Sequence, residues 1–162
     1  MTTNYEGNSE ESKIHSLYHQ ILKYWNERNA VAMANLFESS GDLIGFDGSH
    51  FKGKGEIEKH LSYIFTNYPT PKYVGKIRGI RFFNPESGIL FAVAGIIDPN
   101  TNNIRQELNT VQTLVALKQD KEEGWKIALY QNTPASYHDR PKLCEQLTEE
   151  LTEILQQHGP TQ

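Results

Sequence analysis

The chain has 162 residues, of which 37% are hydrophobic and 22% are charged, and its net charge is −4 with the histidines neutral. These values are typical of one folded domain with a substantial core, and they exclude general disorder. The sequence has no Lys/Arg-rich stripe and no apolar run of about 20 residues, so neither nucleic acid nor a membrane is expected as a partner. With only one cysteine, Cys144, no intramolecular disulfide can form. The polar N-terminus is unlike a signal peptide, and together these features favour the cytoplasm.

The first part of the chain has the periodicity of amphipathic helices. Asn8 is a candidate cap for the first helix, whose apolar residues lie on one face: Ile14, Leu17, Tyr18, Ile21, Leu22 and Trp25. Asn29 is placed to cap a second, short helix over residues 30–37, which the Gly41-Asp42 pair interrupts.

A short hairpin and a third helix come next. Residues 43–47 and 50–53 predict two short strands, because Asp47-Gly48 between them is a typical hairpin turn. Residues 54–68 predict a helix, and the prolines that follow end it.

After residue 72 the apolar spacing changes to that of strands. The sequence predicts strands over 73–84, 89–97, 104–118 and 125–132, the first of them bulged at Gly79. Residues 89–97 read ILFAVAGII and are apolar at every position. A strand of this kind is buried on both faces, and a second copy of the chain is the simplest cover for the outer face. We therefore expect a homodimer built through the convex face of the sheet.

The C-terminal segment predicts a last helix with an apolar face. Asp139 and Pro141 are typical helix openers, and the apolar positions are Leu143, Leu147, Leu151, Ile154 and Leu155. The expected organisation is a disordered tail over 1–8, a domain over 9–138, and a helix over 139–158 packed on that domain or on its dimer partner. Helices grouped before a run of antiparallel strands predict an α+β domain with helices on one face of a curved sheet.

Several stretches carry a resemblance to a known group of proteins. They are YWNERNAVAMANLF, FDGSHFKGKGEIEKHL, IRFFNPESGILFAVAG and GWKIALYQNTP. In order and content they resemble the nuclear transport factor 2-like superfamily (SnoaL-like), in particular its SgcJ/EcaC branch, close to the calcium/calmodulin-dependent kinase II association domain. The resemblance implies a cone-shaped α+β barrel with an internal pocket. The sequence contains no GxGxxG, phosphate loop or flavin signature, and we expect no cofactor.

A cone of this shape directs certain side chains inward, and these are the candidate site residues. Asp47 and His60 are the candidate catalytic pair, because a carboxylate beside an imidazole in an apolar cavity can act as acid and base. The alternative is that Asp47 caps its own turn and that His60 is a packed helix histidine. The candidate ligand-binding residues are Tyr18, Trp25, Phe37, Phe46, Arg81, Gln112 and Gln131.

Two further patterns affect the site. If Trp125 points into the core, strict alternation brings Gln131 into the cavity and turns Asn132 to the opposite face. His15 and His19 have the i, i+4 spacing of metal ligands, but no third ligand is evident, so we expect no metal.

Two functions fit these observations. The first is a pocket protein that binds a small, partly apolar molecule, with isomerase, cyclase or dehydratase-like chemistry through Asp47 and His60. The second is a non-catalytic ligand-binding or association module. An Asp47 carboxylate that bonds its own turn and lies in bulk solvent favours the second.

Overall fold

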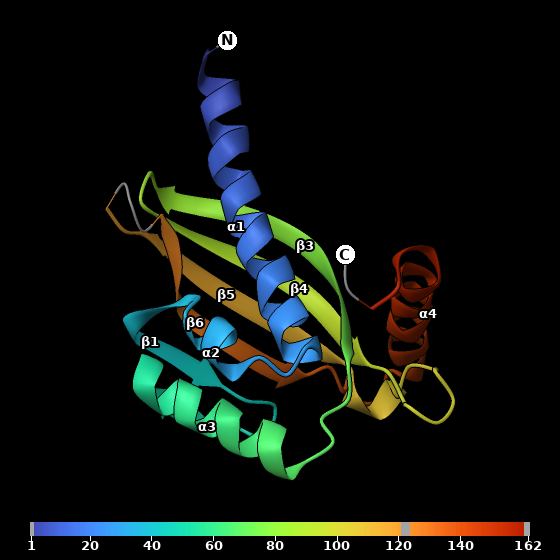
Figure 1. Ribbon diagram of the computed structural model, residues 1–162. Coiled ribbons are helices and arrows are strands. Elements are labelled where there is room, and N and C mark those ends of the chain that lie inside the picture. Colours follow the sequence, from blue (N-terminus) through green and yellow to red (C-terminus); the bar gives the residue numbers. More distant parts are fainter. Residues whose placement is uncertain (1, 121–123, 161–162) are drawn as a thin grey trace.

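The computed structural model describes residues 2–120 and 124–160, and for residues 2–8 only the backbone. The helices are α1 (Thr2–Asn26), α2 (Ala30–Ala34), α3 (Lys54–Asn67) and α4 (Pro141–His158), with a short 3-10 turn at Gln106–Leu108. The strands are β1 (Phe37–Ile44), β2 (His50–Lys52), β3 (Tyr73–Asn84), β4 (Ser87–Ile96), β5 (Thr110–Lys118) and β6 (Trp125–Pro134). Helix α1 crosses one face of a strongly curved sheet, and α3 lies beside β1 (Figure 1).

The strands form one six-stranded sheet in the order β2-β1-β6-β5-β4-β3. The predicted curved α+β architecture is confirmed, with one difference: β1 pairs with β6 in parallel, so the sheet is mixed. Register shifts interrupt β3 between Ile77 and Gly79, as predicted, and β6 opposite Val115 and Ala116. Such bulges bend and twist strands, which is how a sheet of long strands closes around a helix.

The main core lies on the concave face of the sheet. The apolar face of α1 packs there against Leu90, Leu114 and Ile127, together with Ile57 and Leu61 from α3. Asn29 caps α2 as predicted, since its side chain accepts a hydrogen bond from the Ala32 N–H at 3.0 Å.

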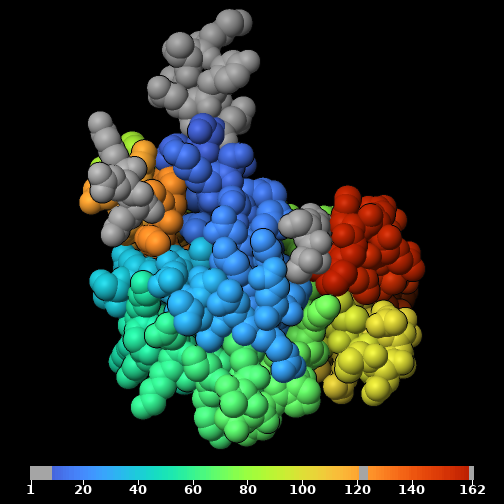
Figure 2. Space-filling model, viewed as in Figure 1, coloured from blue at the N-terminus to red at the C-terminus, as the bar shows by residue number. Residues whose placement is uncertain are grey.

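Helix α4 covers part of the convex face. Leu147 and Leu151 are buried there against Val74, Val93 and Ile97, with Ile154 and Leu155 packed at the margin. Glu150 anchors the same helix through ion pairs with Lys76 and Arg78 of β3. The helix therefore docks on its own chain, and it supplies part of the cover that the doubly apolar strand needs. In Figure 2, α4 (red) lies at one side of the molecule, next to the connection between β4 and β5 (yellow).

Some element boundaries differ from the sequence prediction. Helix α1 begins at Thr2, ahead of the expected cap at Asn8, while the predicted disorder of residues 1–8 stays a prediction. Phe37 opens β1 instead of closing the second helix. Gly41 lies inside this strand. A Cβ at this position would come within 2.8 Å of the Ile127 carbonyl oxygen, so the glycine permits close packing of two strands and does not form a turn. The strand predicted from residue 104 begins at Thr110, after the 3-10 turn.

Candidate functional site

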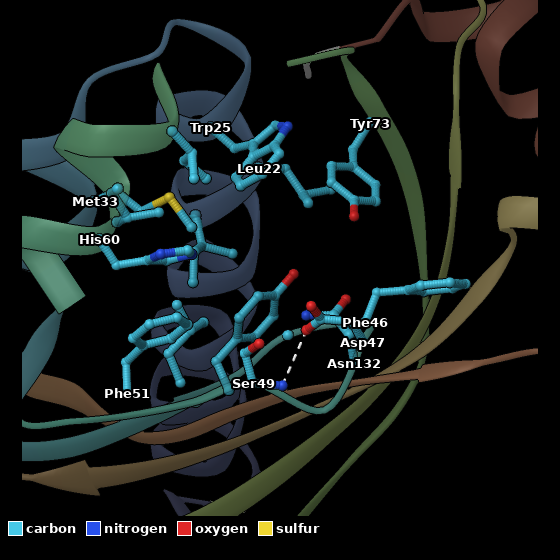
Figure 3. Close-up of a pocket in the computed structure, with 16 residues that line it drawn as sticks. Leu22, Trp25, Met33, Phe46, Asp47, Ser49, Phe51, His60, Tyr73 and Asn132 are labelled. Atoms are coloured by element: carbon cyan, nitrogen blue, oxygen red, sulfur yellow. Dashed lines mark hydrogen bonds between the residues drawn. The ribbon is translucent and has the colours of Figure 1, made fainter. Parts of the chain in front are cut away.

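A cavity of about 270 Å³ lies between the helices and the concave face of the sheet. Its walls are mostly aliphatic and aromatic, and the polar groups gather on the side of the sheet (Figure 3). The lining residues are Ile21, Leu22, Trp25, Met33, Leu43, Gly45, Phe46, Asp47, Ser49, Phe51, His60, Leu61, Ile64, Tyr73, Tyr130 and Asn132. A largely apolar cavity with a few convergent polar groups is the usual form of a small-molecule site.

A buried hydrogen-bond network supports the polar side of the cavity. The Tyr18 hydroxyl donates to Gln112 Oε1 at 2.7 Å, and Gln112 Nε2 donates to Asn132 Oδ1 at 2.8 Å. Tyr18 and Gln112 are fully buried, so they lie behind the cavity wall. Burial raises the pKa of Tyr18 and that of Tyr130 well above the usual value, and it raises the pKa of Tyr73 to about 12. All of these phenols therefore stay protonated near neutral pH.

Gly75 lets the Tyr18 hydroxyl reach its position. A Cβ at residue 75 would lie 2.2 Å from the Tyr18 hydroxyl oxygen and 2.7 Å from Leu22. Only a glycine permits the backbone of β3 to approach the tyrosine this closely. The network thus depends on a backbone position far from it in sequence.

The prediction that Gln131 lines the cavity is wrong, and Asn132 lines it instead. The register of β6 against β5 shifts at Ala128, between the pairs Ala116–Ile127 and Val115–Leu129. One extra residue in a strand moves every later side chain to the other face. Trp125 and Ile127 face the core as expected, but beyond the bulge Tyr130 and Asn132 do so, and Gln131 points away.

Asp47 lies at the rim of the cavity and caps its own turn. Its Oδ1 accepts a hydrogen bond from the Ser49 N–H at 2.9 Å, and the residue is exposed. Hydrogen bonds from Ser49 hold the pKa of this carboxyl below its usual value, with burial contributing little. This is the turn-capping arrangement given above as the alternative to catalysis.

His60 forms part of the cavity wall on α3. Its ring stacks on Phe51 with 3.7 Å between the ring centroids and an angle of 15° between the planes. Partial burial lowers the pKa of the imidazole, although the charge of Asp47 opposes the shift. The ring is therefore neutral at pH 7, and it can donate or accept a proton at the cavity surface.

The remaining predicted residues divide into those at the cavity and those away from it. Trp25 and Phe46 line it, and the Trp25 indole N–H is fixed by a 2.9 Å hydrogen bond to the Pro71 carbonyl oxygen. Phe37 is buried in the core without lining the cavity. Arg81 is exposed, with its guanidinium 5.5 Å from the Phe83 ring centroid, and so does not line it. Sequence reasoning missed Tyr73 and Tyr130: it assigned Tyr73 to a strand without deciding its face, and strict alternation turned Tyr130 away from the cavity together with Asn132.

The histidine pair on α1 does not form a larger cluster in the described part of the chain. The rings of His15 and His19 lie 4.6 Å apart, and no group of three or more His, Cys, Asp or Glu side chains suited to a metal occurs among the described residues. None of the helices in the described ranges has the length and apolar character required to cross a membrane.

Comparison with solved structures identifies the fold. No family model matches the chain, and no curated protein matches its sequence. A protein of unknown function with a cystatin-like fold from Nostoc punctiforme superposes with a TM-score of 0.75 at 22% identity, over 92% of this chain and 96% of that one. The chain therefore has the cystatin-like fold, which is also that of proteins described as nuclear transport factor 2-like.

Other neighbours carry functional descriptions. One, provisionally assigned as a scytalone dehydratase from Novosphingobium aromaticivorans, matches with a TM-score of 0.67 at 16% identity, over 83% of this chain and 89% of that one. Another, provisionally assigned as a calcium/calmodulin-dependent protein kinase II association domain from Xanthomonas campestris, matches with a TM-score of 0.60 at 18% identity, over 76% and 86%. At these identities the similarity establishes the fold and leaves the activity to the site.

Proposed function

We propose that the protein binds a small, partly apolar molecule in the cavity and does not transform it. The observation that carries this proposal is the position of Asp47, which bonds its own turn at the rim. The cavity keeps apolar walls, a polar side and a neutral imidazole, but it has no carboxylate aimed inward. Such a site supplies burial and orientation for a ligand.

The two tryptophans of the chain provide an internal test of binding. Trp25 lines the cavity, whereas Trp125 donates its indole N–H to Glu10 at 2.7 Å elsewhere in the core. We expect the bicyclic probes indane or 1-indanone to shift the indole N–H signal of Trp25 in ¹H–¹⁵N NMR spectra and to leave that of Trp125 in place. Ile64→Phe, which narrows the cavity, should weaken the effect, and Val31→Phe on the exposed surface should not. Failure of both probes to shift the Trp25 signal would refute the proposal.

A second candidate function rests on His60. A neutral imidazole on the cavity wall can remove a proton next to a carbonyl group, and one neighbour of the same fold is described as ketosteroid isomerase-like. In this reaction the α-proton passes to the imidazole, and the resulting enolate regains a proton from it. Exchange of the α-protons of 1-indanone in deuterated water, followed by NMR, tests for it. Exchange that is catalysed by the protein and lost in His60→Gln would make the protein an enzyme.

We also propose that the protein forms a homodimer through the part of the convex face that α4 leaves open. Phe91 on β4 is 38% exposed and Phe83 on β3 is 56% exposed. Partly buried Ile89, Val115 and Leu129 lie in register across three neighbouring strands of the same face. Neighbours described as association domains have this fold. Light scattering at micromolar concentration should give twice the chain mass of 18.5 kDa, and Phe91→Lys should return the monomer mass.

A further inference from the structure

In each hydrogen bond behind the cavity wall, the donor and the acceptor can be identified. Gln112 has one acceptor oxygen and two N–H donors in its side chain. The oxygen accepts from Tyr18, and one N–H donates to Asn132 Oδ1. Tyr130 lines the cavity beside this amide, and its contact with Gln112 partly offsets the rise in the Tyr130 pKa that burial causes. The oxygen and one N–H of this fully buried amide are therefore used inside the wall.

The assignment of donors and acceptors determines which polar groups of the wall remain available to a ligand. Tyr130 lines the cavity, and a phenol O–H in that position can be donated to a ligand. Because Asn132 Oδ1 accepts from Gln112, the Asn132 amide nitrogen is the group left for other partners. Within the described residues it makes one long contact, of 3.5 Å, to the Ile44 carbonyl oxygen. Tyr73, opposite, points its hydroxyl into the open space (Figure 3). The polar side of the cavity is thus a set of converging donors.

The charges around the cavity oppose a negatively charged ligand. None of the lining residues is lysine or arginine, and the one ionised side chain among them is Asp47 at the rim. A carboxylate or phosphate that entered would lose its hydration without gaining a cation, which is costly in an apolar site. A neutral acceptor, such as a carbonyl oxygen, gains the donated hydrogen bonds at a smaller desolvation cost.

From these features we infer that the ligand is a neutral ring compound, of one or two rings, whose carbonyl oxygen accepts hydrogen bonds from Tyr130, Asn132 and Tyr73. The cavity of about 270 Å³ is near the lower end of the range for small-molecule sites, which limits the ligand to this size. The flat walls formed by Trp25 and the Phe51–His60 stack suit a ring. This inference rests on the proposed binding function and adds the ligand's chemical class to it.

Three probes of matched shape test the class: indane, 1-indanone and indane-1-carboxylate. We expect 1-indanone to bind about tenfold more tightly than indane, the factor that one good hydrogen bond contributes. We expect indane-1-carboxylate to bind at least about tenfold more weakly than the ketone at pH 7.5. The carbonyl stretching band of bound 1-indanone should also move to lower frequency than in hydrocarbon solvent, because hydrogen bonds weaken the C=O bond.

Single-atom variants identify the donors. Tyr130→Phe should remove most of the ketone's advantage and leave indane affinity within about twofold, whereas Tyr68→Phe on the exposed surface should change neither. Equal affinity for indane and 1-indanone, or tightest binding of the carboxylate, would overturn the ligand class while leaving the binding function intact. Failure of all three probes to bind would overturn both.

Discussion

Removal of one buried oxygen tests whether the wall of the cavity is organised as the structure shows. Tyr18→Phe deletes the hydroxyl that donates to Gln112 at 2.7 Å, in a place where both side chains are 0% exposed. Gln112 Oε1 then has no partner and no access to bulk water. A buried acceptor left in this state costs about 1–3 kcal/mol of stability. For a chain of this size that corresponds to a fall in melting temperature of about 2–12 °C.

Urea unfolding followed by circular dichroism measures the cost, with Tyr68→Phe as the control for loss of an exposed hydroxyl. The double variant Tyr18→Phe with Gln112→Leu adds a second check, because the unpartnered oxygen is then absent. The two changes should not add, and the coupling energy should be about 1 kcal/mol or more. A single variant as stable as the wild type would show that Tyr18 and Gln112 are not hydrogen-bonded in the folded protein.

Three other predictions concern the scaffold. Gly75→Ala should lower stability by about 1–3 kcal/mol and perturb the Trp25 NMR signal, because the new Cβ collides with the Tyr18 hydroxyl. Leu151→Ala should cost about 2–5 kcal/mol in urea unfolding, since Leu151 of α4 is fully buried between this helix and the sheet, and an unchanged midpoint would mean that α4 is not docked. Ion pairs with Arg78 and Lys76 lower the pKa of Glu150 from its usual 4.5 to about 2. Their stabilisation is thus present above about pH 4.5 and lost as the pH falls towards 2, so Glu150→Gln should destabilise the protein at pH 7 and lose that effect near pH 2.

The sequence allowed most of the fold to be predicted because its periodicity is strong. The apolar face of the first helix from Ile14 to Trp25 packs on the sheet as predicted, and the bounds of the strand at 73–84 agree with those observed. The errors occur where a single residue has a role that depends on distant contacts. In the sequence Gly41 resembles a helix breaker. In the structure its small size is needed because β6, which follows much later in the chain, packs closely against it.

The site could be predicted in outline only. Trp25, Phe46, Asp47 and His60 do line the cavity, because the two helices and the turn that carry them were predicted. The strand expected over 43–47 is wrong in its bounds, since β1 (Phe37–Ile44) ends before Phe46. The interaction between Asp47 and the Ser49 N–H was foreseen as an alternative, and local sequence could not decide between the two, because both place Asp47 at the same turn. The position of Arg81, by contrast, depended on how β3 resumes its alternation after the bulge.

The bulge in β6 matters most for function, because it determines which side chains the cavity receives. Without it, the strand would bring Leu129 and Gln131 inward and turn Tyr130 and Asn132 outward. The wall would then lose the phenol of Tyr130 and the amide of Asn132, and Gln112 Nε2 would lose the oxygen to which it donates. A buried amide with unused groups is costly, so the network and the bulge stabilise each other. Strict alternation, the rule that predicted Gln131, fails at Ala128, and the bulge there gives Gln112 its hydrogen-bond partner in Asn132.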